Sequence, residues 1–209
     1  ANLLHKISPQ SFGEIYDLIG YSDLFINLLS SSIFKISRKI LKVPFEVPLY
    51  FTQNRILMQL PKNDERLSDW HQETFYTIPN SKNYLQCWFP LFYDSNSENG
   101  SIHICPGSHK EGIAKSKIYN PEGRISQVTV DPCVIKKYEP IQLEIKRGDC
   151  IIFDGKLIHK SGYNQSTRTR FSAISMIHDL LGSENATVPK PKFEYRGIAP
   201  KDWHAEIFN

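Results

Sequence analysis

The sequence predicts a mainly β protein, a sandwich or barrel, with helices at its N-terminal end. The chain has 209 residues, of which 40% are hydrophobic and 12% aromatic, and this suits one domain with a stable core. Apolar residues recur at helical spacing over residues 8–42. From about residue 46 the chain becomes a series of short β-branched or aromatic segments bounded by turn residues, which is typical of sandwiches and barrels.

The helical region begins with a recognisable start signal. In "SPQSFGEIYDLIG", Ser8 is placed to cap a helix and Pro9 to occupy its first position. The segment "DLFINLLSSSIFKISRKIL" continues with a similar period. We expect these helices to pack against a sheet through their apolar positions, which in the first segment are Phe12, Ile15, Tyr16 and Ile19.

The strand-like region has clear turns between its segments. "FDGKLIH" carries an Asp-Gly pair between two apolar runs and predicts a tight hairpin, and "SENGS" predicts another turn. Residues 111–140 are mixed and polar, and we expect a long excursion over the mouth of the barrel. The predicted strands lie in "VPLYFTQNRILMQLP", "WHQETFYTIP", "NYLQCWFPLFYD", "GSIHICPGSH", "QVTVD", "IQLEIKRGDCIIFDGKLIHKSGYN" and "RTRFSAISMIHD".

Composition excludes several classes of partner. The net charge is +3 and the basic residues are scattered, so no nucleic-acid partner is expected. No apolar stretch approaches a membrane span, so no membrane partner is expected, and the first residues lack the order of a signal peptide. The four cysteines form no CxxC pair, so no zinc knuckle is expected, and we expect a reduced, cytoplasmic protein. The sequence does not indicate an oligomeric state.

The stretch "WHQETFYTIP" raises the possibility of a metal site. On a strand His71 and Glu73 would project from the same face, but such a tripeptide arises by chance in many proteins, and an ordinary aromatic-rich strand is the competing interpretation. His159 is the candidate for a third ligand. Two histidines and one carboxylate make the facial triad of non-haem Fe(II) oxygenases, which leaves positions open for a cosubstrate and O2.

A second signal follows His159 by 11 residues. Arg170 and Ser172 would share a strand face, and a guanidinium beside a hydroxyl can clamp a carboxylate such as the distal one of 2-oxoglutarate. Arg168 competes for this role, because on a strand it would lie on the same face. The spacing and the following serine favour Arg170.

Three blocks together resemble the phytanoyl-CoA dioxygenase (PhyH-like) family of Fe(II)/2-oxoglutarate oxygenases. They are "WHQE", "LQCWFPLFYDSNSENGSIHICPGSHKEG" and "RGDCIIFDGKLIHKSGYNQSTRTRFSAIS", in the family's order, within roughly residues 50 to 178. The resemblance implies a double-stranded β-helix (jelly-roll, cupin-like) with flanking N-terminal helices. It implies one domain, 1–209, with helical support over 1–45, a core over 46–180 and a tail over 181–209.

The resemblance also implies roles for individual residues. His71, Glu73 and His159 would bind Fe(II), with Glu73 standing where the family usually has Asp. Arg170 would pair with the distal carboxylate of 2-oxoglutarate. The remaining cosubstrate contacts would come from Ser161, Ser172, Trp88 and, as a weaker candidate, Gln59.

The activity that follows is hydroxylation of an unactivated C–H bond in a small molecule, with 2-oxoglutarate and O2 consumed and succinate and CO2 released. Two alternatives stay open: a non-catalytic cupin-like ligand-binding protein, or the same iron site used for desaturation or epimerisation. Several other residues are expected to be structural or solvated, namely His103, His109, His178, His204, Lys115 and Lys117, while Trp70, Phe75 and Tyr76 are candidates for the substrate pocket.

Overall fold

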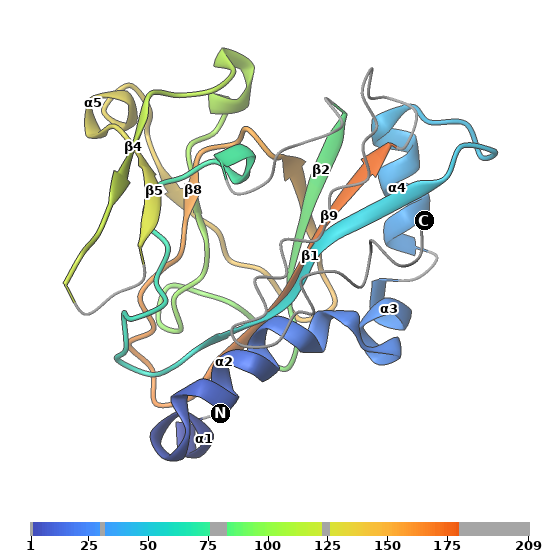
Figure 1. The fold of residues 1–209 in the computed structure, drawn as a ribbon. Coiled ribbons are helices and arrows are strands. Elements are labelled where there is room, and N and C mark those ends of the chain that lie inside the picture. The colour runs from blue at the N-terminus through green and yellow to red at the C-terminus, as the bar shows by residue number, and fades with distance from the viewer. Residues whose placement is uncertain (1, 30–31, 76–82, 123–125, 180–209) are drawn as a thin grey trace, which may run out of the picture.

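The core of the protein is a pair of antiparallel β-sheets (Figure 1). The computed structural model describes residues 2–29, 32–75, 83–122 and 126–179. The main sheet has four strands in the order β1 (Leu49–Gln59), β9 (Arg170–Asp179), β2 (Tyr84–Pro90) and β7 (Ile151–Asp154). A three-stranded sheet has the order β6 (Ile141–Gln142), β3 (His103–Ile104) and β8 (His159–Lys160), and β4 (Ser116–Tyr119) pairs with β5 (Gln127–Val130). The predicted jelly-roll class with N-terminal helices is confirmed.

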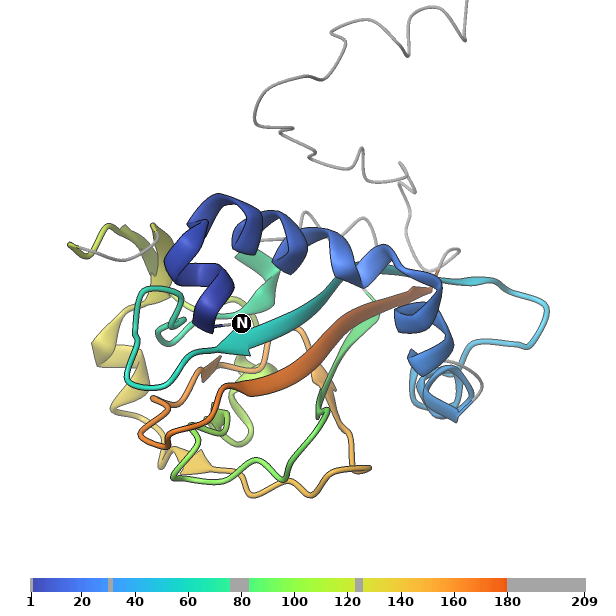
Figure 2. The ribbon, with the colours of Figure 1, turned by 90° about the horizontal axis from the view of Figure 1, so that it is seen from below.

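The N-terminal helices cover the outer face of the main sheet. Figure 2 shows the first helices lying along β1, and Figure 1 shows α4 at the far end of β9. Ser8 caps α2 as predicted, since its hydroxyl accepts a hydrogen bond from the Ser11 N–H. The predicted apolar face is right for Phe12, which is fully buried, but wrong for Ile15, which is 45% exposed. The helical elements are α1 (Asn2–Ile7), α2 (Pro9–Leu18), η1 (Ile19–Tyr21), α3 (Asp23–Leu29) and α4 (Ser32–Leu41).

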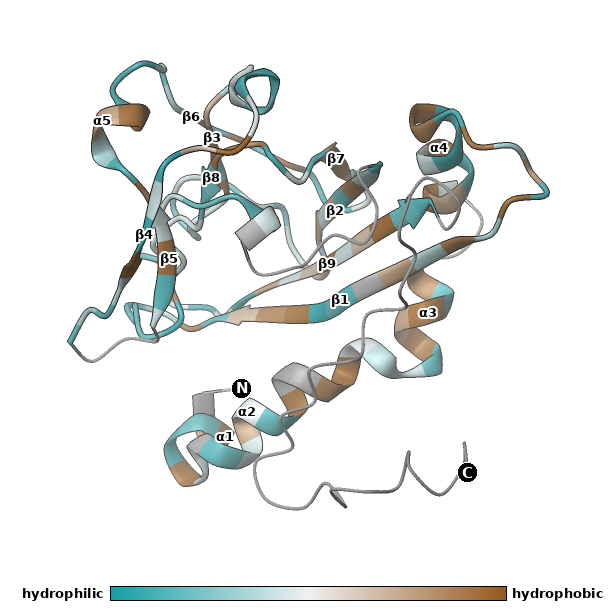
Figure 3. Ribbon diagram, turned by 45° about the horizontal axis from the view of Figure 1, so that its top comes forward, coloured by the Kyte–Doolittle hydropathy of each residue, from teal (hydrophilic) through white to brown (hydrophobic). Residues whose placement is uncertain are grey.

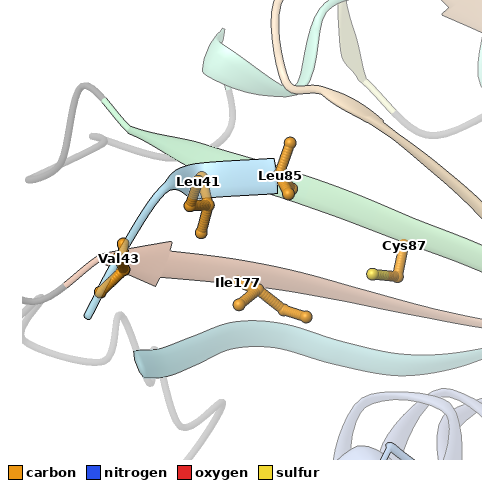
Figure 4. Close-up of a cluster of buried hydrophobic side chains, with 5 residues drawn as sticks. All are labelled: Leu41, Val43, Leu85, Cys87 and Ile177. Carbon is orange, nitrogen blue, oxygen red and sulfur yellow. The ribbon is translucent and has the colours of Figure 1, made fainter. Parts of the chain in front are cut away.

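Apolar side chains between the helices and the main sheet form the outer core. Figure 4 shows one cluster, in which Leu41 and Val43 meet Leu85 and Cys87 of β2 and Ile177 of β9. A second cluster joins Phe25 and Leu29 of α3 to Phe89 and Ala173 of the sheet. Colouring by hydropathy shows hydrophobic residues on α3 and along β1 and β9 (Figure 3). Burial of such side chains fixes the sheet against the helices.

The inner face of the main sheet packs toward the second sheet. Trp88 and Ile174 cluster there with Ile102 and Ile145, with Ile104 of β3 packed against them. Because successive side chains of a strand alternate between faces, the residues of β9 that share the inner face with Ile174 are Arg170, Ser172, Met176 and His178. The candidate site therefore lies inside the jelly-roll.

The predicted hairpin in "FDGKLIH" is wrong. β7 pairs with β2 in the main sheet, whereas β8 pairs with β3 in the second sheet, so this segment crosses between the sheets. The Asp154 side chain accepts a hydrogen bond from the Lys156 N–H at 2.8 Å, which turns the chain at the Asp-Gly pair. The local turn signal is real, but the strands it joins have different partners.

Residues 111–140 contain more structure than the polar excursion predicted. They hold the β4–β5 pair and the short helix α5 (Pro132–Ile135), which Asp131 caps through the Cys133 N–H. A 3-10 turn, η3 (Ser108–Glu111), precedes them. The four cysteines are free thiols. Within the described ranges, no helix is long and apolar enough to cross a membrane.

Candidate metal centre

His71 and His159 are brought together by direct cross-strand pairing. The N–H of each residue donates to the carbonyl of the other, at 2.9 Å and 3.0 Å, so they form an isolated antiparallel bridge at the edge of β8. In such a pair the two side chains leave from the same face and lie close together. The two imidazole centroids are accordingly 4.2 Å apart.

Glu73 reaches the histidines from a turn and not from a strand. It begins the 3-10 turn η2 (Glu73–Phe75), so the prediction that His71 and Glu73 share a strand face is wrong in its local structure. The turn nevertheless returns the carboxylate to the histidine pair. Glu73 Oε2 lies 3.7 Å from His71 Nε2 and 3.8 Å from His159 Nε2, and all three residues are buried.

The two imidazoles are oriented as metal ligands require. The Nδ1 of His71 is 2.6 Å from the Asp69 carbonyl, and the Nδ1 of His159 is 2.8 Å from the Leu157 carbonyl. Only Nδ1–H can donate to a carbonyl, so each neutral ring presents the Nε2 lone pair to the centre. The sequence could not identify these two partners.

The donor set fits a divalent cation. The three ligand atoms lie within 4.8 Å of one another, and the Nε2–Oε2 separations exceed those of hydrogen bonds. Three buried ligand atoms that converge in this way can share one divalent cation. Two imidazole nitrogens and a carboxylate oxygen are the ligands that Fe(II) takes in oxygenases with a facial triad.

Charge and burial hold these groups in the forms that bind a metal. Burial alone would raise the pKa of Glu73, but its interactions with His71, His159 and Arg55 outweigh burial and lower the pKa below the ordinary value. Burial, with a smaller contribution from the neighbouring His71, lowers the pKa of His159 to about 3. A carboxylate beside a neutral imidazole is the protonation state of ligands that need no further deprotonation.

Gln72 braces the metal segment between two of the predicted ligands. Its amide donates to the carbonyls of Gly112 at 2.9 Å and Lys156 at 2.6 Å, and its oxygen accepts from the Ala114 N–H at 2.8 Å. Gln72 is fully buried, so these bonds tie His71 and Glu73 to two distant segments. Sequence reasoning missed this role of Gln72.

Arg170 lies on the inner face of β9, where it shares a strand face with Ser172 as predicted and contacts the Trp88 ring. The guanidinium donates to the Gly100 carbonyl, its carbon lies 5.5 Å from the centroid of the Trp88 ring, and Arg170 is only 6% exposed. Ser172 is fully buried, and its hydroxyl has no hydrogen-bond partner among the described residues. A cation, an aromatic wall and a spare hydroxyl suit a carboxylate ligand.

The position of Arg170 depends on a close approach of two loops. Gly100 has a φ of +80°, and a Cβ built on it would lie 2.5 Å from the Gly162 carbonyl oxygen. A larger residue would push apart the loops that hold the Arg170 guanidinium. Asn164, fully buried, fixes the same region by donating to the carbonyls of Gln59 and Arg168 at 3.0 Å and 2.8 Å. Sequence reasoning missed Asn164, although it belongs to the block "HKSGYN".

Gln59 and Ser161, two of the predicted cosubstrate residues, do not join the cluster of Arg170, Ser172 and Trp88. The Gln59 amide donates to the Asn63 carbonyl at 2.6 Å, so it already holds a loop, although Gln59 pairs with Arg170 across the strands. Ser161 is half-buried and lines a cleft of about 290 Å³ with Asp69 and His103. Its hydroxyl forms no hydrogen bond with the rest of the described chain.

Arg168, the alternative to Arg170 as the carboxylate clamp, lies apart from the metal centre. Arg168 precedes β9 and is exposed, with its guanidinium 5.4 Å from the Tyr93 ring, so the expectation that it shares a strand face with Arg170 is wrong. It lines a cleft of about 720 Å³ that does not include the triad. Trp70 packs against the second sheet under Lys160. The side chain of Phe75, and Tyr76 and His204, lie outside the described residues.

The other histidines that the structure describes take no part in the triad. His103 lies edge-on to Trp70, with ring centroids 6.3 Å apart, and His109 belongs to η3. His178 stacks between Tyr50 and Tyr84 at the far end of the main sheet. Lys115 is highly exposed and lies 3.6 Å from Asp131.

A jelly-roll that buries two histidines and a glutamate between its sheets defines a cupin-type protein with a candidate metal centre. The chain belongs to the phytanoyl-CoA dioxygenase (PhyH) family, since that family's model matches residues 16–172. It is 30% identical over 142 residues to a phytanoyl-CoA dioxygenase domain-containing protein 1 homolog of Dictyostelium discoideum, covering 66% of this chain and 50% of the relative. It is 29% identical over 170 residues to the phytanoyl-CoA dioxygenase of Arabidopsis thaliana, covering 80% and 52%. The chain thus spans about half the length of these curated relatives.

Solved structures share the fold at lower identity. EvdO2 from Micromonospora carbonacea var. aurantiaca complexed with 2-oxoglutarate has a TM-score of 0.59 at 21% identity, covering 73% of this chain and 62% of that one. The epimerase SnoN in complex with Fe3+, alpha ketoglutarate and nogalamycin RO has a TM-score of 0.60 at 19% identity, covering 78% and 62%. EctD from S. alaskensis with 2-oxoglutarate and 5-hydroxyectoine has a TM-score of 0.59 at 18% identity, covering 78% of this chain and 55% of that one.

Proposed function

We propose that the protein is an Fe(II)- and 2-oxoglutarate-dependent dioxygenase that hydroxylates a small molecule. One observation carries the proposal: three buried ligand atoms converge in the same jelly-roll interior that holds the buried Arg170. A triad with an arginine clamp is what iron and a dicarboxylate cosubstrate require together. The family and the fold relatives with bound 2-oxoglutarate support it.

Each residue has a defined task in this proposal. His71, Glu73 and His159 hold the iron through Nε2, a carboxylate oxygen and Nε2, in the orientations that the Asp69 and Leu157 carbonyls fix. When bound, the iron supplies the activation of O2, coupled to conversion of 2-oxoglutarate to succinate and CO2. Glu73 and His159 need no proton transfer to bind the metal, since the pKa of each is lowered, which keeps Glu73 ionised and His159 neutral.

The cosubstrate would lie along the inner face of β9. Arg170 would hold its distal carboxylate, with Ser172 donating its unused hydroxyl and Trp88 packing beside the chain. Gln59 and Ser161 stay weaker candidates, because Gln59 already bonds Asn63 and Ser161 lines a neighbouring cleft. Arg170 is only 6% exposed, and the lower dielectric of such a buried position would strengthen the carboxylate–guanidinium interaction.

Residues 1–209 are proposed to work as one unit, with helical support over 1–45, a jelly-roll core over 46–180 and a tail over 181–209. The tail lies outside the described residues. A small molecule is the proposed substrate, because the fold relatives SnoN and EctD have small molecules bound in their structures. A cytoplasmic location stays a prediction from cysteine usage.

Anaerobic addition of Fe(II) and 2-oxoglutarate to the apoprotein tests the proposal. The expected result is a weak visible metal-to-ligand charge-transfer band that His71→Ala abolishes and Arg170→Ala weakens, while the exposed-arginine control Arg168→Ala keeps it. Admission of O2 should then release succinate. No band in the wild type overturns the oxygenase proposal.

The same experiment separates the alternatives. A band without succinate release would favour a non-catalytic binding protein. The SnoN epimerase shows that this fold hosts a different outcome, so product analysis separates hydroxylation from epimerisation or desaturation once a substrate is found.

A further inference from the structure

Two of the four cysteines are neighbours on the outer face of the main sheet. Cys87 belongs to β2 and pairs with Ile152 of β7. Cys150 stands two residues before Ile152, so strand alternation directs both cysteines to the same face as diagonal neighbours. The packing agrees, because Cys150 packs against the buried cluster that contains Cys87 (Figure 4).

The two thiols interact directly. Each side chain has the largest influence on the pKa of the other, and their interaction raises the pKa of Cys87 and lowers the pKa of Cys150. Cys87 therefore keeps its proton and donates it in a hydrogen bond to the Cys150 sulfur. The backbone of Trp88, the residue after Cys87, also lowers the pKa of Cys150, which places the Cys150 sulfur beside the peptide that follows Cys87.

The two thiols differ in their access to solvent. Cys87 is fully buried, and Ser37 of α4, which is fully buried itself, interacts with the Cys87 thiol from the helix side. Cys150 is only half-buried and directly precedes β7, which forms the edge of the main sheet. A reagent in solution therefore meets Cys150 first. The thiolate is the reactive form of a cysteine, so the more accessible thiol is also the one whose lowered pKa favours reaction.

The backbone at Cys150 is able to bring the two cysteines into bonding distance. A disulfide needs Cα atoms within about 7 Å of each other, and diagonal neighbours on paired strands are about 7–8 Å apart. The last pair of the β2–β7 ladder is Trp88 with Ile151, so Cys150 lies just outside the ladder. A small shift of the Cys150 backbone therefore closes the remaining distance without breaking a strand pair.

We propose that Cys87 and Cys150 form a thiol oxidation site, in which a disulfide oxidant such as oxidised glutathione converts the pair into an intramolecular disulfide. The Cys150 thiolate attacks one sulfur of the oxidant, which forms a mixed disulfide and releases the first thiolate. Cys87 then loses its proton and attacks the Cys150 sulfur, which releases the second thiolate. Two protein thiols are oxidised in this way, and one disulfide of the oxidant is reduced to two thiols.

The oxidation site lies on strands whose opposite faces line the proposed active site. Trp88 follows Cys87, and its ring centroid lies 5.5 Å from the guanidinium carbon of Arg170. Phe153 of β7 lies 5.1 Å from the His159 ring, measured between centroids. A bond between Cys87 and Cys150 therefore ties together the two strands behind these residues. The inference itself does not depend on the proposed function, since it needs neither iron nor 2-oxoglutarate.

Mass spectrometry of the folded chain tests the proposal. The reduced protein is incubated with oxidised glutathione without added metal, and the remaining thiols are then alkylated under denaturing conditions. The expected result is a cross-linked peptide that joins Cys87 to Cys150, with neither of these cysteines alkylated. Cys133→Ser removes an exposed thiol on α5 and should form the same link. Alkylation of both Cys87 and Cys150 in the wild type, or a link from either to Cys105 or Cys133, overturns the proposal.

Single substitutions test the order of the two steps. Cys87→Ala removes the second thiol and should leave a stable glutathione adduct on Cys150, which dithiothreitol then removes. Cys150→Ser changes a half-buried side chain outside the strands, so it keeps the test available even if Cys87→Ala does not fold. In Cys150→Ser the buried Cys87 should stay unmodified. An adduct on Cys87 in Cys150→Ser, or an unmodified Cys150 in folded Cys87→Ala, contradicts the assignment of Cys150 as the attacking thiol.

Discussion

The two faces of β9 differ in how they treat their polar groups. On the outer face, the Ser175 hydroxyl donates to Asn54 Oδ1 at 2.7 Å, and Ala173 and Ile177 pack under the helices. On the inner face, the Ser172 hydroxyl is equally buried but has no partner among the described residues. The polar group on the outer face is hydrogen-bonded within the protein, whereas the hydroxyl on the inner face is left for a ligand to bind. Alternation along one strand therefore places residues that stabilise the fold on one face and residues proposed to bind a ligand on the other.

The largest effect is expected at the inner site itself. His159→Ala removes one of three metal ligands and should weaken Fe(II) binding by at least roughly 100-fold, because loss of groups that merely orient a ligand already costs 10–100-fold. Calorimetric titration with Fe(II) under anaerobic conditions measures it. His103→Ala, on the neighbouring strand, is the control and should bind as wild type does. Fe(II) binding by His159→Ala at wild-type affinity would contradict the assignment of His159 to the metal centre.

A substitution on the outer face should lower the free energy of unfolding and leave the affinity for 2-oxoglutarate unchanged. Ile177 is fully buried among Leu41, Val43, Leu85 and Cys87, so Ile177→Ala should lower the free energy of unfolding by about 3 kcal/mol. Urea denaturation measures this, and 2-oxoglutarate affinity should stay within twofold of wild type. A large loss of cosubstrate affinity in a still-folded variant would show that the two faces are not independent.

The pH dependence of stability probes the inner face beyond the metal centre. His178 is buried with a pKa lowered to about 4, below its ordinary value of about 6.5. Between these pH values the unfolded chain takes up a proton that the folded chain does not, so stability falls as pH falls from about 6.5 to about 4. The loss for this residue should be on the order of 1–3 kcal/mol.

Urea denaturation of the apoprotein at a series of pH values measures that loss, and His178→Phe should reduce it. A slope will remain in the variant, because the pKa of His159 is also lowered, to about 3. An identical pH profile in wild type and His178→Phe would contradict the assignment.

Much of the site was predictable because its signals are local. A capping serine, a histidine two residues from a carboxylate, and an arginine at the start of an apolar strand can each be recognised in the sequence, and the structure brings His71, Glu73 and His159 together. The combination of these signals with the order of the three sequence blocks indicated the family. The block order also linked His71 to Arg170, which lie nearly 100 positions apart in the chain.

The remainder depended on contacts between distant segments. The Asp-Gly pair gives a turn, but whether the next strand pairs back is decided by packing with β2 and β3. Glu73 reaches the centre through a 3-10 turn that strand alternation does not predict. Gln72 and Asn164 find partners 40 to 105 residues away, so no local pattern reveals what they brace.

The smallest effects give the most direct test, because they come from one atom on each face of β9. The measurement is 2-oxoglutarate affinity and free energy of unfolding, taken together for Ser172→Ala and Ser175→Ala. Ser175→Ala should lose about 1–2 kcal/mol of stability, since Asn54 loses its donor, and keep wild-type affinity. Ser172→Ala should keep its stability or gain some, and bind 2-oxoglutarate several-fold more weakly. If instead Ser172→Ala is destabilised and binds normally, the inner face is an ordinary core and the division of the strand is wrong.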